Sequence, residues 1–120
     1  MMVRFTLNIM PSSAYGMNAI YSGRHWAERK KQVQAIHLLV RAAIRKQIRN
    51  PQMFRGPVSV SIYYNSRLDI DNHGYLAKLI IDGMKGILIE DDDRRYVKEL
   101  HQCFHADDKN VIFVEVKEYA

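Results

Sequence analysis

The stretch VSVSIYYNSRLDIDN, residues 58–72, joins a strand pattern to a pair of acids, and the rest of the chain is arranged around it. Its first eight residues alternate between apolar and polar side chains. This period of two predicts a strand with one face toward the core, in a sheet covered on one side. The last four residues, Asp69 to Asn72, precede a segment of helical periodicity. The apolar face of the strand consists of Val58, Val60, Ile62 and Tyr64.

Helical periodicity is found on both sides of this stretch. Before it, a long amphipathic helix is predicted from about residue 26 to residue 49, and Asn50-Pro51 ends it. After it, a second helix is predicted from about residue 72 to residue 85, with Gly86 as its stop. The side chains expected to pack in the core are Val33, Ile36, Val40, Ala43 and Ile44 from the first helix and Leu76, Leu79, Ile80 and Met84 from the second.

Two glycines lie within the second helix. Gly74 and Gly83 each weaken it by about 1 kcal/mol relative to Ala. Its stability is therefore expected to come from packing.

Three further strands complete the pattern. Residues 3–9 alternate like a strand and are followed by a long loop over residues 11–23. Residues 95–104 and 111–116 are predicted to form a hairpin closed by a turn at residues 107–110. The order β-α-β-α-β-β predicts the α+β class, with one domain over residues 1–120 and helices packed on a mixed sheet.

The net charge of +5 is unevenly placed along the chain. Residues 1–55 hold ten Lys and Arg against the single acid Glu28, whereas residues 56–120 hold eight Lys and Arg against twelve acids. A basic half beside an acidic half indicates a polyanionic partner, bound apart from a carboxylate site. The alternative is that the charges are solvated helix faces.

The cysteine content and the length of the apolar runs bear on the cellular location of the protein. Cys103 is the only cysteine, so no disulfide can form within the chain, which suits a reducing compartment. No run approaches the roughly 20 apolar residues of a membrane span. The sequence predicts a soluble cytoplasmic protein with no membrane partner.

The two aspartates of the opening stretch are candidate metal ligands. If the strand stays extended past Asn65, Asp69 and Asp71 lie on its wet face, roughly 6 to 7 Å apart. Like charges this close are costly without a counter-ion, and hard carboxylate oxygens favour Mg²⁺, with Mn²⁺ as a substitute. The alternative is that Asp71 or Asn72 caps the second helix.

A second acidic group, Glu90 to Asp93, follows the second helix. The loop after Gly86 can fold back to lay one of these acids beside Asp69 and Asp71, and a solvated turn is the alternative. Lys78 lies two helical turns after Asp71 on the same face, where it can hold a phosphate or a leaving oxygen. The alternative for Lys78 is an exposed lysine paired with Asp82.

The ordered set of these motifs resembles the RusA-type Holliday-junction resolvases, a family common in phages and prophages. The N-terminal part is similar to the same family, so the resemblance spans nearly the whole chain. It implies a homodimeric, Mg²⁺-dependent endodeoxyribonuclease of DNA recombination and repair that cuts four-way junctions symmetrically. The residues that carry it are RLDIDN (67–72), Lys78, Asp82 and GILIEDDDRR (86–95), with Pro11-Ser12, Asn18, Tyr21 and the basic helix after GRHW (23–26).

The resemblance also implies roles for individual residues. Asp69 and Asp71 match the first two metal-binding carboxylates, and Lys78 matches the catalytic lysine. The third ligand is one acid of the run Asp91 to Asp93, and Asp92 is preferred because it belongs to the matching acid pair in both possible registers. The gap of seven from Asp71 to Lys78 departs from the best-known members, where it is shorter, whereas the spacing of Lys78 to Asp82 is kept.

The implied mechanism is metal-assisted phosphodiester hydrolysis, in which Lys78 and Arg67 neutralise charge on the phosphoryl oxygens. A basic surface is expected to hold the branched DNA by its phosphates without reading sequence. It consists of the i, i+4 stripe Arg41, Arg45 and Arg49, with Arg29, Lys30 and Lys31 nearby.

Two other functions stay open at this point. One is a nuclease on the same fold that prefers flaps or other branched DNA. The other is a non-enzymatic basic DNA-binding module whose acids are caps and turns. For the expected homodimer, the strand at residues 3–9 and the C-terminal hairpin are the candidate interfaces.

Overall fold

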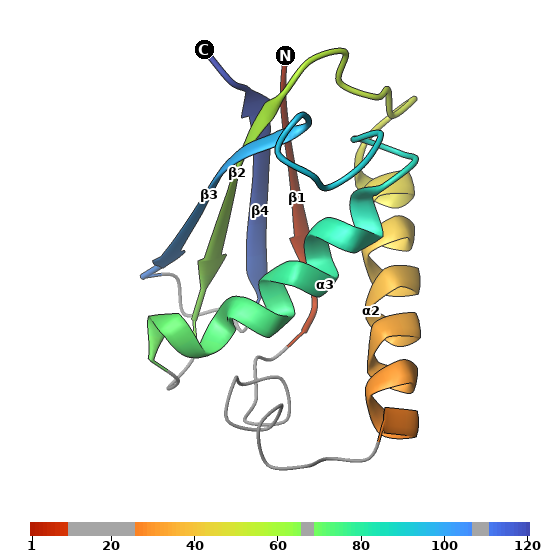
Figure 1. The fold of residues 1–120 in the computed structure, drawn as a ribbon, viewed down its shortest axis with the longest axis vertical. Coiled ribbons are helices and arrows are strands. Elements are labelled where there is room, and N and C mark those ends of the chain that lie inside the picture. Colours follow the sequence, from red (N-terminus) through yellow and green to blue (C-terminus); the bar gives the residue numbers. More distant parts are fainter. Residues whose placement is uncertain (10–25, 66–68, 107–110) are drawn as a thin grey trace.

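The computed structural model describes residues 1–9, 26–65, 69–106 and 111–120, and of Trp26, Ala27, Asp71 and Asn72 it describes the backbone only. The predicted loop at 11–23, the predicted turn at 107–110 and Arg67 lie outside the described residues. The described chain forms four strands, two α-helices and one 3₁₀ helix (Figure 1). The elements are β1 (Met2–Leu7), α2 (Trp26–Gln47), β2 (Val58–Tyr64), η2 (Ile70–His73), α3 (Gly74–Met84), β3 (Val97–Phe104) and β4 (Ile112–Glu118).

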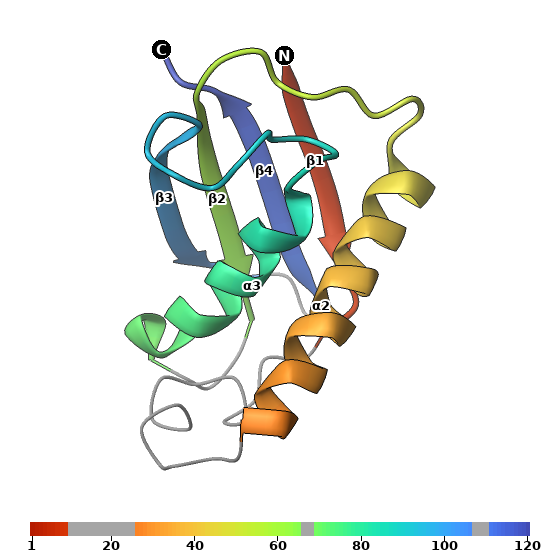
Figure 2. The same ribbon diagram turned by 45° about the vertical axis from the view of Figure 1, so that its right-hand side comes forward.

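The strands form one mixed sheet in the order β1-β4-β2-β3, and both α-helices lie on the same face of it (Figures 1 and 2). The predicted α+β class, with helices packed on a mixed sheet, is confirmed. Neither described helix is long and apolar enough to cross a membrane.

The predicted C-terminal hairpin is wrong, because β3 and β4 are not neighbours. Strand β4 lies between β1 and β2 and pairs antiparallel with both. Strand β3 pairs parallel with β2 at the edge of the sheet. A parallel pair needs a crossover connection, and α3 supplies it.

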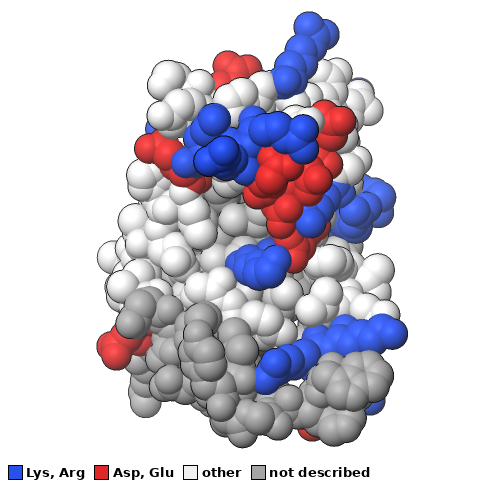
Figure 3. All heavy atoms as spheres, viewed as in Figure 1, with Lys and Arg blue, Asp and Glu red and all other residues white. Residues whose placement is uncertain are grey.

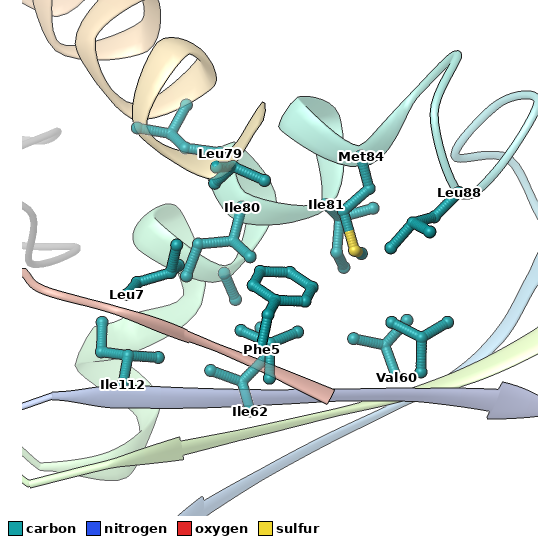
Figure 4. Close-up of a cluster of buried hydrophobic side chains, with 14 of the residues drawn as sticks. Phe5, Leu7, Val60, Ile62, Leu79, Ile80, Ile81, Met84, Leu88 and Ile112 are labelled. Atoms are coloured by element: carbon teal, nitrogen blue, oxygen red, sulfur yellow. The ribbon is translucent and has the colours of Figure 1, made fainter. Parts of the chain in front are cut away.

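The core lies between the helices and one face of the sheet, as the two periodicities predict. Figure 4 shows side chains of the sheet, such as Phe5 and Ile62, pointing toward side chains of α3, such as Ile80 and Met84. The predicted apolar face of β2 is fully buried, and the four predicted core residues of α3 are buried with it. From α2, the residues Ile36, Val40 and Ile44 are buried, and Val33 and Ala43 pack against them.

The opposite face of β2 is not wet along its whole length. Ser59 is 2% exposed and Ser61 is 8% exposed, although the sequence pattern predicts a solvated face. Both serines belong to an inner strand, and each pairs with longer side chains on the neighbouring strands. The stems of such side chains shield a short one between them.

A residue in the left-handed conformation follows each helix. Gly86, two residues after the end of α3, has a φ of +80°, which glycine adopts without strain. Asn50, three residues after the end of α2, has a φ of 51°. Both helices therefore end shortly before the residues that were predicted to stop them.

The two edges of the sheet differ. At the β1 edge, the side-chain amide of Gln47 accepts a hydrogen bond from the backbone N–H of Thr6 and donates one to its carbonyl, each at 2.8 Å. At the β3 edge, no described segment pairs with the outer side of the strand. One edge is therefore occupied by a side chain at Thr6, and the other has no partner within the described chain.

Candidate active site

Asp69 follows the end of β2 by five residues and directly precedes η2. It is exposed, its backbone is extended, and η2 begins at the next residue. The chain therefore does not stay extended through Asp71, and strand alternation does not place these two aspartates. Arg67 and the side chains of Asp71 and Asn72 lie outside the described residues. Neither Asp69 nor His73 makes a side-chain capping hydrogen bond to the helix that follows it.

His73 fixes this acidic segment against the sheet. It is 1% exposed, and its ring stacks on Tyr64 of β2 with centroids 3.9 Å apart. Its edge meets Phe104 of β3 at 5.8 Å. Burial raises the pKa of the Tyr64 phenol, whose hydroxyl donates to Gln102 Oε1 at 2.9 Å. Asp69 is thereby held near the C-terminal ends of β2 and β3.

A second group of charges is gathered at the other end of α3. The ammonium nitrogen of Lys85 lies 3.4 Å from Asp82 Oδ1, 3.7 Å from Asp91 Oδ1 and 3.2 Å from Asp92 Oδ1. Lys78 Nζ donates to Asp82 Oδ2 at 3.3 Å. We call these five residues the carboxylate–lysine cluster; Figure 3 shows acidic and basic side chains packed together over this part of the molecule.

The cluster shifts the pKa values of Asp82 and Lys85 in opposite directions. Burial acts to raise the pKa of the Asp82 carboxyl, but the neighbouring Asp92 carboxyl and the ammonium groups of Lys78 and Lys85 outweigh it, so this pKa is lowered. Burial acts to lower the pKa of Lys85, and its contacts with Asp92 and Asp82 reverse the effect and raise it. Asp82 Oδ1 is buried and has no hydrogen-bond donor among the described residues. The charges therefore stabilise one another in a partly buried place.

The three acids of the 91–93 run have different partners. Asp91 Oδ1 accepts a hydrogen bond from the backbone N–H of Asp92 at 2.8 Å. Asp93 is held by the Arg95 side chain at 3.1 and 2.8 Å and by its backbone N–H at 2.9 Å. These hydrogen bonds with Arg95 lower the pKa of Asp93 to about 2. Both Asp91 and Asp92 contact the Lys85 ammonium, and Asp92 is the one that also contacts Asp82.

Arg41 connects α2 to this cluster. Its Nη2 donates to the backbone carbonyl of Lys85 at 2.6 Å, directly after the end of α3. It is therefore half-buried and engaged, whereas Arg45 and Arg49 of the same stripe are exposed. Of the remaining predicted DNA-binding residues, Lys30 and Lys31 are exposed and Arg29 is half-buried.

The structure does not bring the two acidic groups of one chain together. Asp69 lies before α3 and the cluster lies at its end, so the 11 residues of α3 separate them by about 16 Å. The loop after Gly86 was expected to fold back toward Asp69 and Asp71. Instead it stays at the C-terminal end of α3, because Arg41 and the ion pairs of Lys85 hold it there.

The donor atoms suit Mg²⁺, but their arrangement within one chain is incomplete. Carboxylate oxygens are the ligands that Mg²⁺ prefers. Among the described residues, however, no three His, Cys, Asp or Glu side chains are grouped so that they could hold a metal ion. The place between Asp82, Asp91 and Asp92 is taken by the Lys85 ammonium.

Lys85 was not predicted as a site residue from the sequence, and Asp82 was considered only for its spacing to Lys78. Their spacing carried a signal, since Asp82 has a lysine four residues before it and another three residues after it. Both intervals place the lysines beside the same helical acid.

A hollow of about 570 Å³ on the open face of the sheet contains none of the predicted site residues. Its lining includes Arg4, Thr6, Tyr63, His105, Phe113 and Glu115.

Comparison of the sequence with known protein families and with curated proteins found no match. The assignment of a function therefore depends on the residues themselves and on the motif resemblance.

Proposed function

We propose that the protein is a Mg²⁺-dependent endodeoxyribonuclease that resolves four-way DNA junctions by paired, symmetric phosphodiester hydrolysis. The proposal begins from the resemblance of RLDIDN, Lys78, Asp82 and the EDDD run to the RusA-type resolvases. The observation that carries it furthest is the carboxylate–lysine cluster. Residues 78, 82 and 92, which the resemblance selects by spacing alone, lie in contact around one point.

In this reaction the acidic residues would bind the metal ion and the basic residues would contact phosphates. Asp69, Asp71 and Asp92 supply hard anionic ligands, and a bound divalent cation would supply Lewis-acid activation of the phosphodiester and of water. Lys78, whose side chain is 67% exposed beside Asp82, is accessible to a phosphoryl oxygen on which charge develops. Arg45, Arg49, Lys30 and Lys31 are exposed and available to phosphates along the DNA arms.

A second function is favoured by the same cluster. The Lys85 ammonium already contacts three carboxylates and offsets part of their charge, as a purely structural group of acids requires. The runner-up is therefore a basic DNA-binding module without catalysis. A nuclease for flaps or other branched DNA is the third possibility on the same residues.

One assay separates the three functions. A synthetic four-way junction, a flap and a linear duplex of equal length are each incubated with the protein in Mg²⁺, in Mn²⁺ and in EDTA. We expect cuts at symmetric positions in two opposing strands of the junction only, abolished by EDTA and by Asp69→Asn or Asp92→Asn. Preferential flap cutting supports the branched-DNA nuclease. Binding to the junction without cleavage in either metal overturns the proposed function in favour of the binding module.

A further inference from the structure

The ammonium group of Lys85 lies among three carboxylates that come from two parts of the chain. Its nitrogen is 3.4 Å from Asp82 Oδ1 on α3. It is 3.7 Å from Asp91 Oδ1 and 3.2 Å from Asp92 Oδ1, both in the loop before β3. Among the described contacts, Lys78 reaches one of these acids, Asp82, at 3.3 Å. Lys85 is therefore the described cation that all three acids share.

The backbone of Lys85 is fixed, whereas its side chain is not enclosed. Arg41 Nη2 donates to the Lys85 carbonyl at 2.6 Å. The next residue, Gly86, donates its N–H to the Ile89 carbonyl at 2.7 Å. The Lys85 side chain itself is 37% exposed. The ammonium can therefore leave the acids by rotation of its own side chain, without movement of α3.

The distances around Lys85 suit an ammonium group and not a divalent metal ion. Ligand oxygens lie about 2.1 Å from a bound Mg²⁺, whereas the three carboxylate oxygens lie 3.2 to 3.7 Å from the Lys85 nitrogen. This spread agrees with the described residues having no three His, Cys, Asp or Glu side chains grouped for a metal ion. A metal ion here requires that the ammonium leave and that the carboxylates close in by about 1 Å or more.

The present arrangement leaves both an atom and a charge of the acids uncompensated. Asp82 Oδ1 is buried and accepts no hydrogen bond from the described residues, which is costly for a carboxylate oxygen. At neutral pH the three acids carry a formal charge of −3 and their two lysine partners +2, so one negative charge remains. A divalent ion in place of the Lys85 ammonium would bind the buried oxygen and balance the charge.

We propose that Lys85 is the resident counter-cation of Asp82 and Asp92, and that a divalent metal ion binds these two acids by displacing its ammonium. The inference rests on the proposed function in one respect, because it takes Asp92 to be a metal ligand. It adds a control of that ligand, since Asp92 is not available to the metal while Lys85 is in place. The displaced ammonium stays tethered beside the acids by its fixed backbone, where it can contact a DNA phosphate.

Chemical labelling of the wild-type protein tests the displacement directly. An amine engaged by carboxylates reacts slowly with an N-hydroxysuccinimide ester, and a released amine reacts faster. We expect Mg²⁺ to increase the labelling of Lys85 several-fold in mass spectra, relative to NaCl of equal ionic strength. Lys98 is exposed and has no ion pair among the described contacts, so its labelling should not change. Unchanged labelling of Lys85 at saturating Mg²⁺ overturns the displacement.

The binding of Mn²⁺ by matched variants tests the competition without DNA, with the free ion measured by its EPR signal. Lys85→Met removes the ammonium at similar side-chain length, and we expect it to bind Mn²⁺ about ten-fold or more tightly than the wild type. Adding Asp92→Asn should abolish this gain. Lys78→Met removes an ammonium that contacts Asp82 alone, and we expect a smaller gain. An equal gain in the two lysine variants, or a gain that survives Asp92→Asn, overturns the displacement.

The two experiments separate this inference from the proposed function. The labelling uses the wild-type chain, so it decides the displacement even when Lys85→Met does not fold. A protein that cleaves no junction but shows Mg²⁺-dependent labelling of Lys85 loses the proposed function and keeps the displacement. A protein that cleaves in Mg²⁺ with the labelling of Lys85 unchanged keeps the function and loses the displacement.

Discussion

Lys85 connects the acidic side chains that surround the end of α3. Its ammonium contacts carboxylates from three positions, and its carbonyl is held by Arg41. A single side chain thus ties the end of α3 to the loop that leads into β3. Removing one member of a partly buried group of charges leaves the others without compensation, which costs more than losing an exposed ion pair.

Asp93 bonds to Arg95, whereas Asp92 contacts Lys85. The pKa of Asp93 should reflect its bonds to Arg95. Its pKa is lowered from 3.8 to about 2 by Arg95. A lowered carboxyl pKa contributes stability that is present above the ordinary value and is lost as the pH falls through the folded value, here between about 4 and 2. We expect carboxyl NMR to give a midpoint near 2 for Asp93 in the wild-type protein.

The adjacent arginines provide a matched comparison for this titration. Arg95→Gln should move the Asp93 midpoint up toward its ordinary value. Arg94→Gln should not move it, because Arg94 makes no ion pair with Asp93 among the described contacts. An Asp93 midpoint near 4 in the wild-type protein would contradict the hydrogen bonds assigned to Arg95.

At the scale of elements, the crossing of α3 over α2 explains a glycine that helix propensity disfavours. A Cβ atom at Gly83 would lie 2.9 Å from Val40 Cβ, closer than side chains approach. Gly83→Ala gains about 1 kcal/mol of helix propensity. Overpacking costs about 1 to 3 kcal/mol, so we expect a net loss of stability in urea unfolding.

Gly56 serves as the control for Gly83. A Cβ atom there meets nothing within 4 Å, so Gly56→Ala should change the unfolding midpoint little. If Gly83→Ala were the more stable of the two variants, the close contact between the helices would be disproved.

The basic stripe of α2 divides into two kinds of residue. Arg45 and Arg49 are exposed, and losing both should reduce the salt slope of DNA binding by about 2 while leaving unfolding unchanged. Arg41 holds the Lys85 carbonyl, and Arg41→Gln should lower stability by about 1 to 3 kcal/mol. Binding titrations at several salt concentrations and urea unfolding measure the two effects. Equal behaviour of the three arginines in both assays would contradict the division.

Local patterns predicted the elements well, because their causes are local. The period of α2, the stop at Gly86 and the alternation of β2 each depend on residues a few positions apart. The order of the strands depends on distant partners. Strand β4 could pair with β3 as a hairpin by sequence alone, but it pairs with β1 and β2, because its apolar face completes the core there.

In the candidate site, too, contacts between residues close in sequence were easier to predict than contacts between distant ones. The contact of Lys78 with Asp82 is an i, i+4 pair, and sequence spacing had given it as the alternative role of Lys78. The approach of Asp92 to Lys85 depends on the path of the loop after Gly86. The sequence led us to expect that this loop approaches Asp69 of the same chain, and that prediction was wrong. Sequence spacing gives no path for a loop, which is fixed here by Arg41 from another helix.

At the scale of the whole molecule, the two edges of the sheet differ. At the β3 edge no described segment pairs with the outer side of the strand, whereas at the β1 edge Gln47 binds the backbone N–H and C=O of Thr6. The paired cleavage that we propose needs two sites related by a two-fold axis, because a four-way junction has such an axis.

The hydrogen bonds of Gln47 to Thr6 leave the sheet one place fewer at which another strand can add. With Gln47→Ala, the freed N–H and C=O of Thr6 and the outer side of β3 would let each chain add another at both edges. We expect such a variant to form long ribbons after a lag, seen as light scattering that rises steeply with concentration. Adding Phe104→Lys should prevent the ribbons, since each chain then keeps a single usable edge. A Gln47→Ala protein without such scattering would mean that something other than this glutamine prevents strand addition.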